Sequence, residues 1–207
     1  MLKIWGRRNS VNVQKVLWCA SELALPYERI DAGLQFGQNK EPWYLALNPN
    51  GRVPLMQDGA LTLWESNSIV RYLCATHDHG GLYPAEPGRR AAAEKWMDWQ
   101  LSTLARPVSI VFQNLVRTSP AERDLGAVGV CTAEANAGFS LLDRHLSTQR
   151  FVGGEEFSMG DIPVGAFAHR WLALDGVERP PWPALGRWLA ELGARRGFRA
   201  HVMVPLS

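Results

Sequence analysis

The chain has 207 residues, of which 46% are hydrophobic and 20% charged, a composition typical of a soluble globular protein. Its net charge of +2 gives no electrostatic reason to expect a nucleic-acid partner. The N-terminal sequence lacks the apolar segment of a signal peptide, and no apolar run approaches membrane-spanning length. Three widely spaced cysteines show no metal-binding or Cys-x-x-Cys spacing and fit a reducing compartment. We therefore expect a cytoplasmic protein without a membrane partner.

The first part of the chain predicts a βαβ unit. Residues Leu2 to Trp5 form a short β-prone run, and apolar residues then recur with helical spacing from Val11 until Pro26. A second β-prone run covers Tyr27 to Ile30. Two strands joined through a helix in this way should be parallel, with a right-handed crossover.

A short helix and a hairpin are predicted next. Residues 41–47 suit a short helix, and residues 53–56 an extended segment entered through Pro54. Asp58-Gly59 is a two-residue hairpin signal, with 60–63 as the returning strand. A third helix then follows the polar residues 65–68. Residues 1–78 are thus expected to form an α/β domain.

Glycine and proline are frequent in residues 79–88, the predicted linker between domains. The remaining residues, 89–207, are expected to form an all-α domain. A long helix over Arg89 to Arg117 should be kinked by Pro107. Ser158 and Asp161 have capping-box spacing at the start of a later helix, and we assign both to folding. Further helices are expected over residues 121–146, from Ser158 to about 174, and from the Pro180–Pro183 region to about 192, with a short terminal helix.

The hairpin region has two features that suit an extended, acidic peptide. Val53 precedes a proline, so its backbone should be extended and able to pair with a ligand main chain. The helix start beside it offers free N–H groups to a carboxylate, and Glu65 could meet an ammonium group. Local physics is equally satisfied by a hairpin that leads into a capped helix.

Asn48-Pro49-Asn50-Gly51-Arg52-Val53-Pro54, followed by Glu65-Ser66, resembles the glutathione site of cytosolic glutathione transferases, in particular bacterial theta-like and nu-like members of the serine type. The resemblance covers nearly the whole chain. It implies a thioredoxin-like N-terminal domain, an all-α helical C-terminal domain and, usually, a homodimer. It also implies a cis Val53-Pro54 bond, pairing of Val53 with the cysteinyl backbone of glutathione, and contacts from Glu65 and Ser66 to the γ-glutamyl end.

The resemblance places the thiol-activating group in the first loop, where Ser10 and Asn12 are the candidates. Ser10 matches the serine of theta-like and phi-like enzymes, but a serine at a helix start is also a common N-cap. The sequence departs from that pattern at Asn12. The nu class, known for reducing disulfides with glutathione, has a threonine and an asparagine at these two positions. We place Ser10 slightly ahead of Asn12.

Gln38, Lys40 and Arg52 are candidates for the glycyl carboxylate of glutathione, although each is explained as well by a solvated surface position. An electrophile pocket is expected between the domains. Its predicted walls are Arg7, Arg8, the segment 103–112 and, with less weight, Trp96 and Trp99.

The sequence thus predicts a glutathione transferase that uses glutathione as co-substrate against a small electrophile or disulfide, in detoxification and without a metal. The first loop contains no cysteine, and Cys19 is expected to be a core thiol rather than a nucleophile. A glutathione-dependent disulfide reductase is the alternative enzyme. A non-catalytic interaction module with the same fold is the alternative outside enzymes.

Overall fold

The computed structural model describes residues 1–78 and 81–207, and the predicted linker 79–88 begins outside that part of the chain. The chain divides into two compact units. The first consists of Met1–His79 and Arg196–Val204, and the second of Gly80–Arg195 and Pro205–Ser207.

The first unit contains a mixed sheet with the strand order β2-β1-β3-β4. The strands are β1 (Leu2–Trp5), β2 (Tyr27–Ile30), β3 (Leu55–Asp58) and β4 (Leu61–Trp64). β1 pairs in parallel with β2, whereas the β1–β3 and β3–β4 pairs are antiparallel, which confirms the predicted βαβ unit and hairpin. Asp58 pairs with Leu61, so the two-residue turn is Gly59-Ala60, one residue later than predicted.

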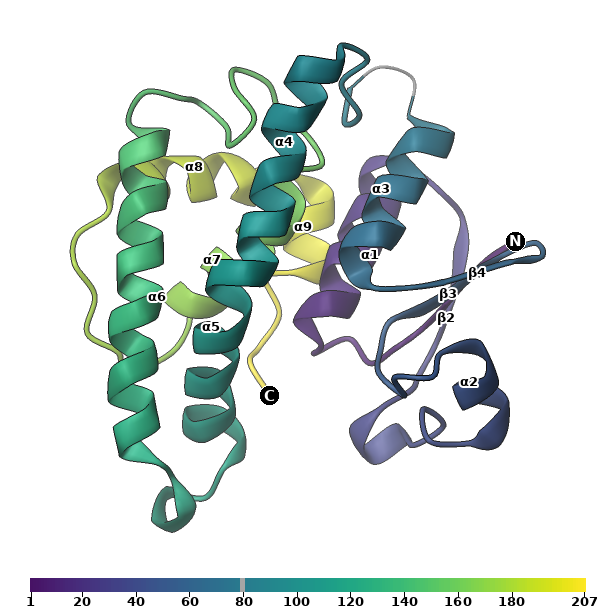
Figure 1. Ribbon diagram of the computed structural model, residues 1–207, viewed down its shortest axis with the longest axis horizontal. Helices are drawn as coiled ribbons and strands as arrows, with labels where there is room; N and C mark the ends of the chain where they lie inside the picture. Colours follow the sequence, from purple (N-terminus) through teal and green to yellow (C-terminus); the bar gives the residue numbers. More distant parts are fainter. Residues whose placement is uncertain (79–80) are drawn as a thin grey trace. The chain divides into compact units, whose positions relative to one another are not determined.

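The helical elements of this unit are α1 (Val11–Glu22), the 3₁₀ turn η1 (Leu34–Phe36), α2 (Pro42–Leu47), α3 (Ser66–His77) and α9 (Arg196–His201), and α9 packs on α1. α1 packs against α3, and Figure 1 shows the two side by side. Side chains alternate between the faces of a sheet, so the paired residues Trp5 and Leu55 share one face. There they form a buried cluster with Tyr44 of α2 and with Ala32.

Helix α9 corrects the predicted domain boundary. The prediction placed residues 89–207 in the C-terminal domain, whereas Arg196–Val204 group with the first unit. The physical reason is aromatic packing, because the rings of Phe198 and Trp18 pack edge to face with their centroids 4.8 Å apart. Both side chains are almost completely buried.

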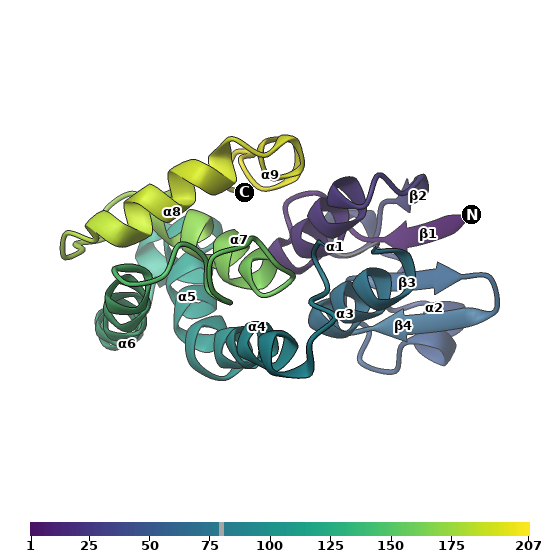
Figure 2. The ribbon, with the colours of Figure 1, turned by 90° about the horizontal axis from the view of Figure 1, so that it is seen from above.

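The second unit is built of helices joined by loops, as predicted, and its described residues add one isolated β-bridge between Phe151 and Gly154. Figure 2 shows α7 beside α4, α5 and α8, and α7 contacts all three. α6 packs against α5 and α8. The elements are α4 (Pro87–Trp99), η2 (Gln100–Leu104), α5 (Ala105–Phe112), η3 (Gln113–Arg117), η4 (Pro120–Glu122), α6 (Leu125–Leu146), α7 (Asp161–Leu172) and α8 (Pro183–Gly193).

The predicted long helix forms as a series of helical segments from Pro87 to Arg117. The segments η2 and η3 are π-helical. Proline has no N–H and its ring clashes with the preceding turn, so an α-helix must adjust before it. The π-helical turn η2 ends three residues before Pro107, where this adjustment is needed.

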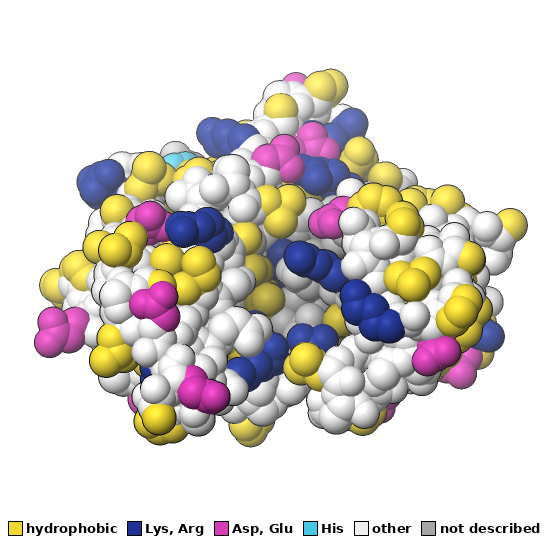
Figure 3. Space-filling model, turned by 60° about the horizontal axis from the view of Figure 1, so that its bottom comes forward, with side chains coloured by type: hydrophobic (Ala, Val, Ile, Leu, Met, Phe, Trp, Pro, Cys, Tyr) yellow, Lys and Arg dark blue, Asp and Glu magenta, His cyan; other side chains and the backbone are white. Residues whose placement is uncertain are grey.

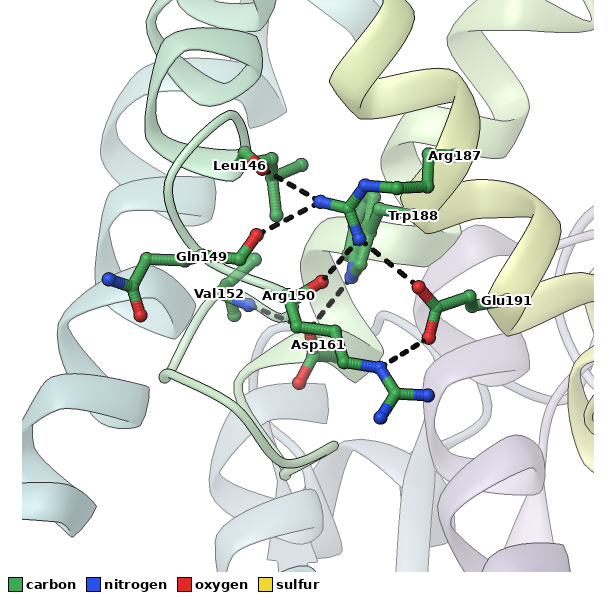
Figure 4. Close-up of polar contacts among 8 residues, drawn as sticks. All are labelled: Leu146, Gln149, Arg150, Val152, Asp161, Arg187, Trp188 and Glu191. Atoms are coloured by element: carbon green, nitrogen blue, oxygen red, sulfur yellow. Dashed lines mark hydrogen bonds and ion pairs between the residues drawn. The ribbon is translucent and has the colours of Figure 1, made fainter.

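Ser158 and Asp161 make one half of the predicted capping box. The Asp161 carboxylate accepts hydrogen bonds from the Ser158 N–H at 2.9 Å and from its hydroxyl at 3.3 Å. The other carboxylate oxygen accepts from the Val152 N–H and the Trp188 indole (Figure 4). The residue before α7 is Gly160 rather than Ser158, which is a correction of the predicted N-cap. Asp161 therefore ties the loop before α7 to α8.

Arg187 of α8 secures the end of α6 (Figure 4). Its guanidinium donates to the carbonyls of Leu146 at 2.7 Å and Gln149 at 3.0 Å. The same side chain pairs with Glu191 at 3.1 Å, and Glu191 also binds Arg150 at 2.8 Å. A cation at the C-terminal end of α6 satisfies carbonyls that the helix leaves open.

One sequence expectation about apolar runs needs correction. α6 has 22 residues and a mean hydropathy of 1.3 in its most apolar stretch, so by length and composition alone it could cross a membrane. Core helices of soluble proteins pass the same test, and α6 packs against α5 and α8, so this is weak support for a membrane span.

Figure 3 shows basic, acidic and hydrophobic side chains together on the face it draws.

Candidate functional site

The loop before β3 is held by side chains from its own neighbourhood. The Arg52 carbonyl accepts hydrogen bonds from Tyr44 Oη at 2.7 Å and from Asn48 Nδ2 at 2.8 Å. The next peptide bond, Val53-Pro54, is cis, as the resemblance implied. Pro54 is buried, whereas Val53 is partly exposed. The loop thus presents the backbone of Val53 from a fixed position.

Ser10 precedes α1 with an extended backbone, φ −84° and ψ 120°. Its carbonyl accepts the first helical bond, from the Gln14 N–H at 2.9 Å. Its hydroxyl makes no capping hydrogen bond to α1 in the described structure. The backbone therefore fulfils the N-cap role, and the hydroxyl is not used to close the helix.

The structure joins Asn12 to Ser66 directly. The Ser66 hydroxyl, at the first residue of α3, donates to Asn12 Oδ1 at 3.3 Å. Lys15, which sequence reasoning missed, contacts Ser66 of this pair. Lys15 of α1 is 0% exposed, and its Nζ lies 3.5 Å from Ser66 Oγ and 3.2 Å from Asn67 Oδ1. The signal was a lysine between buried apolar residues of one helix, because lysine is rarely buried without partners.

Glu65 lies immediately before α3 with a positive φ of 70°. Positive φ is uncommon for a residue with a side chain and costs roughly 1–3 kcal/mol, and such residues concentrate at functional sites. The Glu65 side chain is exposed, whereas Ser66 is 3% exposed. The two predicted γ-glutamyl contacts therefore differ strongly in accessibility.

The three candidates for the glycyl carboxylate also differ. Gln38 Nε2 donates to the Asp31 carbonyl at 2.9 Å, so its donor group is used within the fold. Lys40 is exposed, and its Nζ lies 3.0 Å from the position that a Cβ on Gly51 would occupy. Arg52 is exposed one residue further along. Lys40 and Arg52 thus bring positive charge beside the cis-proline loop.

Gly33 is a second position that sequence reasoning missed. Its φ of +87° favours glycine, and a Cβ here would lie 2.9 Å from Arg7 Nη1 and 3.4 Å from Val53. The absent side chain lets the Arg7 guanidinium lie close to Val53. Arg7, predicted as a pocket wall, is therefore near the residue expected to pair with the ligand backbone.

The predicted residues are only partly connected to one another. Asn12 and Ser66 share a hydrogen bond. Within residues 1–78 and 81–207, no hydrogen bond or ion pair joins the side chains of Ser10, Lys40, Arg52 and Glu65 to the other predicted residues. Lys40, Arg52 and Glu65 are exposed and open to a ligand, whereas only 6% of Ser10 is exposed.

The predicted electrophile pocket draws residues from both units and stays a prediction. Within the second unit, the ring centroids of Trp96 and Trp99 lie 5.0 Å apart. With Lys95 they line a cavity of about 230 Å³. The described residues contain no group of three or more His, Cys, Asp or Glu side chains placed to hold a metal, and the expectation of metal-free chemistry remains untested.

The fold and this loop define a class of protein in which a thioredoxin-like unit precedes a helical one. Comparison with known families agrees. "Glutathione S-transferase, N-terminal domain" matches residues 1–75, and "Glutathione S-transferase, C-terminal domain" matches residues 110–191. The chain belongs to the glutathione S-transferase family.

Individual relatives match over the full length. The chain is 46% identical to Glutathione S-transferase GstB of Escherichia coli (strain K12) over 209 residues, covering 100% of both chains. It is 31% identical to Glutathione S-transferase 3 of Zea mays, covering 99% of this chain and 95% of that protein. A theta class glutathione S-transferase from Xanthomonas axonopodis pv. citri, solved with glutathione bound, is 45% identical with a TM-score of 0.96, covering 100% and 99%. The protein is a glutathione transferase.

Proposed function

We propose that the Ser10 hydroxyl donates a hydrogen bond to the thiolate of bound glutathione, which then attacks an electrophilic carbon. The observation that carries this assignment is that the hydroxyl does not cap α1. The attacking sulfur belongs to glutathione, so Ser10 acts as a donor and not as a nucleophile. Asn12 is the second candidate for this role.

The required energy is within reach of one side chain. A free thiol has a pKa of roughly 8.5, and lowering it by about two units requires about 2.7 kcal/mol of preference for the thiolate. A hydrogen bond to a charged group contributes roughly 1.5–3 kcal/mol. The start of a helix adds roughly 0.3–1 kcal/mol. The Ser10 hydroxyl at the start of α1 therefore suffices.

The other residues hold the tripeptide. The backbone of Val53, fixed beside the cis bond to Pro54, pairs with the cysteinyl residue. Glu65 binds the ammonium of the γ-glutamyl end, and Ser66 binds its carboxylate at the start of α3, where N–H groups favour an anion.

The glycyl carboxylate is bound by Lys40 and Arg52. Both side chains are exposed, whereas the amide N–H of Gln38 is already engaged with the Asp31 carbonyl. Gln38 therefore has the weakest claim of the three predicted residues. Lys40→Met is expected to weaken glutathione binding more than Gln38→Leu does, as measured by isothermal titration calorimetry.

The thiolate assignment is tested by ultraviolet titration of glutathione bound to the protein. Ser10→Ala is expected to raise the pKa of the bound thiol by about one to two units, because it removes one charged hydrogen bond. Asn12→Ala is the matched variant, and we expect a smaller rise. If the bound-thiol pKa of Ser10→Ala equalled that of the wild type while that of Asn12→Ala was raised, the role would transfer to Asn12.

A glutathione-dependent disulfide reductase is the second candidate, and the hydrogen bond from Ser66 to Asn12 supports a role for Asn12. Turnover of a small disulfide, compared with an aromatic halide under the same conditions, separates the two activities. Binding of glutathione with an unshifted thiol pKa would instead favour a non-catalytic module.

We further propose a cytoplasmic homodimer that detoxifies small electrophiles. Trp64 of β4 supports an apolar interface, since 38% of this side chain is exposed. Light scattering after size-exclusion chromatography tests this proposal. A wild-type dimer that becomes a monomer in Trp64→Glu is the expected result, and a monomeric wild type would contradict it.

A further inference from the structure

Lys15 is the most unusual polar side chain of the first unit, because it is completely buried in a helix whose neighbouring residues are largely apolar. Transfer of an ammonium group from water into such a place is costly unless the group is hydrogen-bonded. Two of its contacts lie in the first turn of α3, Asn67 Oδ1 at 3.2 Å and Ser66 Oγ at 3.5 Å. Burying a lysine here costs free energy, and the packing of α1 against α3 would not by itself require a lysine at this position.

The direction of the hydrogen bonds follows from the chemistry of the groups. An ammonium can only donate, so the Ser66 oxygen accepts from Lys15 through a lone pair. The single hydroxyl proton of Ser66 then goes to Asn12 Oδ1 at 3.3 Å. Because Asn12 accepts with its oxygen, its amide nitrogen is left as a donor. Lys15 thereby fixes the orientation of two predicted site residues.

We propose that Lys15 is a positioning residue that adapts Ser66 to the γ-glutamyl carboxylate of glutathione. Lys15 holds the Ser66 oxygen whichever way the hydroxyl proton turns. That proton points to Asn12 in the unliganded protein and is donated to the carboxylate when glutathione binds. The positive charge of Lys15 also favours an anion at Ser66. The inference rests on the proposed role of Ser66.

The test compares two ligands by isothermal titration calorimetry. One is glutathione, and the other is an analogue that lacks only the α-carboxylate of the γ-glutamyl residue. Lys15→Met keeps a side chain of similar length without the charge or the donor. Lys3→Met is the matched control, because Lys3 lies on β1 of the same unit and is exposed.

Lys15→Met is expected to weaken glutathione binding roughly tenfold, the effect of losing one hydrogen bond to a charged group. Binding of the analogue should change less than twofold, and Lys3→Met should alter neither affinity. Equal losses for both ligands would overturn the inference, since Lys15 would then only support the fold. An unchanged glutathione affinity would also overturn it. Equal binding of both ligands by the wild type would instead refute the proposed role of Ser66.

A second measurement needs no substitution of Lys15 and applies even if Lys15→Met does not fold. The chain has four lysines, Lys3, Lys15, Lys40 and Lys95. Nitrogen-15 NMR of lysine-labelled protein identifies the Lys15 ammonium by elimination, using Lys→Arg variants of the other three. Glutathione should shift this resonance more than the decarboxylated analogue does. A resonance that responds equally to both ligands would contradict the role of Lys15.

Discussion

Cys19 of α1 and Cys74 of α3 lie in the core with their sulfur atoms 3.6 Å apart. The contact with the Cys74 thiol and burial both raise the pKa of Cys19 well above its usual value. Only the thiolate is reactive, so Cys19 should be inert at neutral pH. The geometry agrees with the sequence-based interpretation of Cys19 as a core thiol.

We therefore predict that no cysteine of the native protein reacts with Ellman's reagent on the time scale of an exposed thiol. All three cysteines are buried, and all three should react in urea. Cys19→Ala should leave glutathione transfer unchanged. Rapid native labelling that disappears in Cys19→Ala would show that Cys19 is a reactive thiol.

The residues that sequence analysis identified belong to a linear pattern. Val53, Pro54, Glu65 and Ser66 stand at fixed spacing, so their roles could be inferred without coordinates. Lys15 could not be identified in this way, because its contact Ser66 lies 51 positions away. Whether a lysine inside an apolar helix is buried depends on such distant partners.

At the scale of the element, the start of α7 depends on close packing at Gly160. A Cβ on Gly160 would lie 2.7 Å from the Ala93 carbonyl oxygen, which belongs to the backbone of α4. Gly160→Ala should therefore destabilise the protein by roughly 1–3 kcal/mol. Gly186 of α8 is the matched control, since a Cβ there meets nothing within 4 Å.

Gly186→Ala should stabilise the protein by roughly 0.5–1 kcal/mol, because alanine loses less chain entropy in a helix. Urea unfolding of both variants measures the difference. If Gly160→Ala proved as stable as Gly186→Ala, the close approach of α7 to α4 would be wrong.

Asp161 gives the same element a dependence on pH. Burial raises the pKa of Asp161 to about 6, and its four hydrogen-bond donors oppose that shift. The unfolded chain ionises near pH 3.9, so its aspartate loses the proton before the folded one does. The contribution of Asp161 to stability is therefore complete below about pH 4 and falls by roughly 3 kcal/mol as pH rises through 6.

The measurement is the free energy of unfolding of the wild type minus that of Asp161→Asn, taken from pH 4 to 8. We expect this difference to decrease with increasing pH and to level off above about pH 7. A difference that grows with pH would mean that the hydrogen bonds outweigh burial and lower the pKa of the carboxyl group.

Most elements could be predicted from periodicity, because apolar residues recur at helical or strand spacing. The start of α6 could not be predicted in this way. The helix was expected to begin at Ala121, but it begins at Leu125, after the 3₁₀ turn Pro120–Glu122. The π-helical turns were also missed. The turn η2 adds one residue to a helix that continues on either side, so the apolar pattern barely records it, and η3 forms the last turn before the helix ends at Arg117.

At the scale of the whole molecule, the last helix completes the first unit. Phe198→Ala should remove the contact with Trp18 and destabilise the protein by roughly 3–5 kcal/mol. Phe36→Ala is the control in the same unit, because 42% of that side chain is exposed, and a change of about 0.5 kcal/mol is expected. Equal midpoints of urea unfolding for the two variants would contradict the packing of α9.

The division of the chain into an α/β and a helical part followed from the sequence, because the periodicity changes after residue 78. The assignment of α9 did not follow. Nothing local distinguishes a terminal helix that stays with its neighbours from one that packs on a helix at the other end of the chain. Whether the terminal helix packs there depends on the surface around Trp18 that Phe198 covers, and only the assembled first unit forms that surface.

The position of α9 also has a consequence for synthesis on the ribosome. The sheet and α1 to α3 are complete once residue 77 has been made, but Phe198 emerges more than a hundred residues later. At roughly 5–20 residues per second, the nascent first unit waits on the order of 6–24 s with Trp18 uncovered. Synthesis of α9, rather than emergence of the N-terminal domain, is the event that completes the core of the first unit.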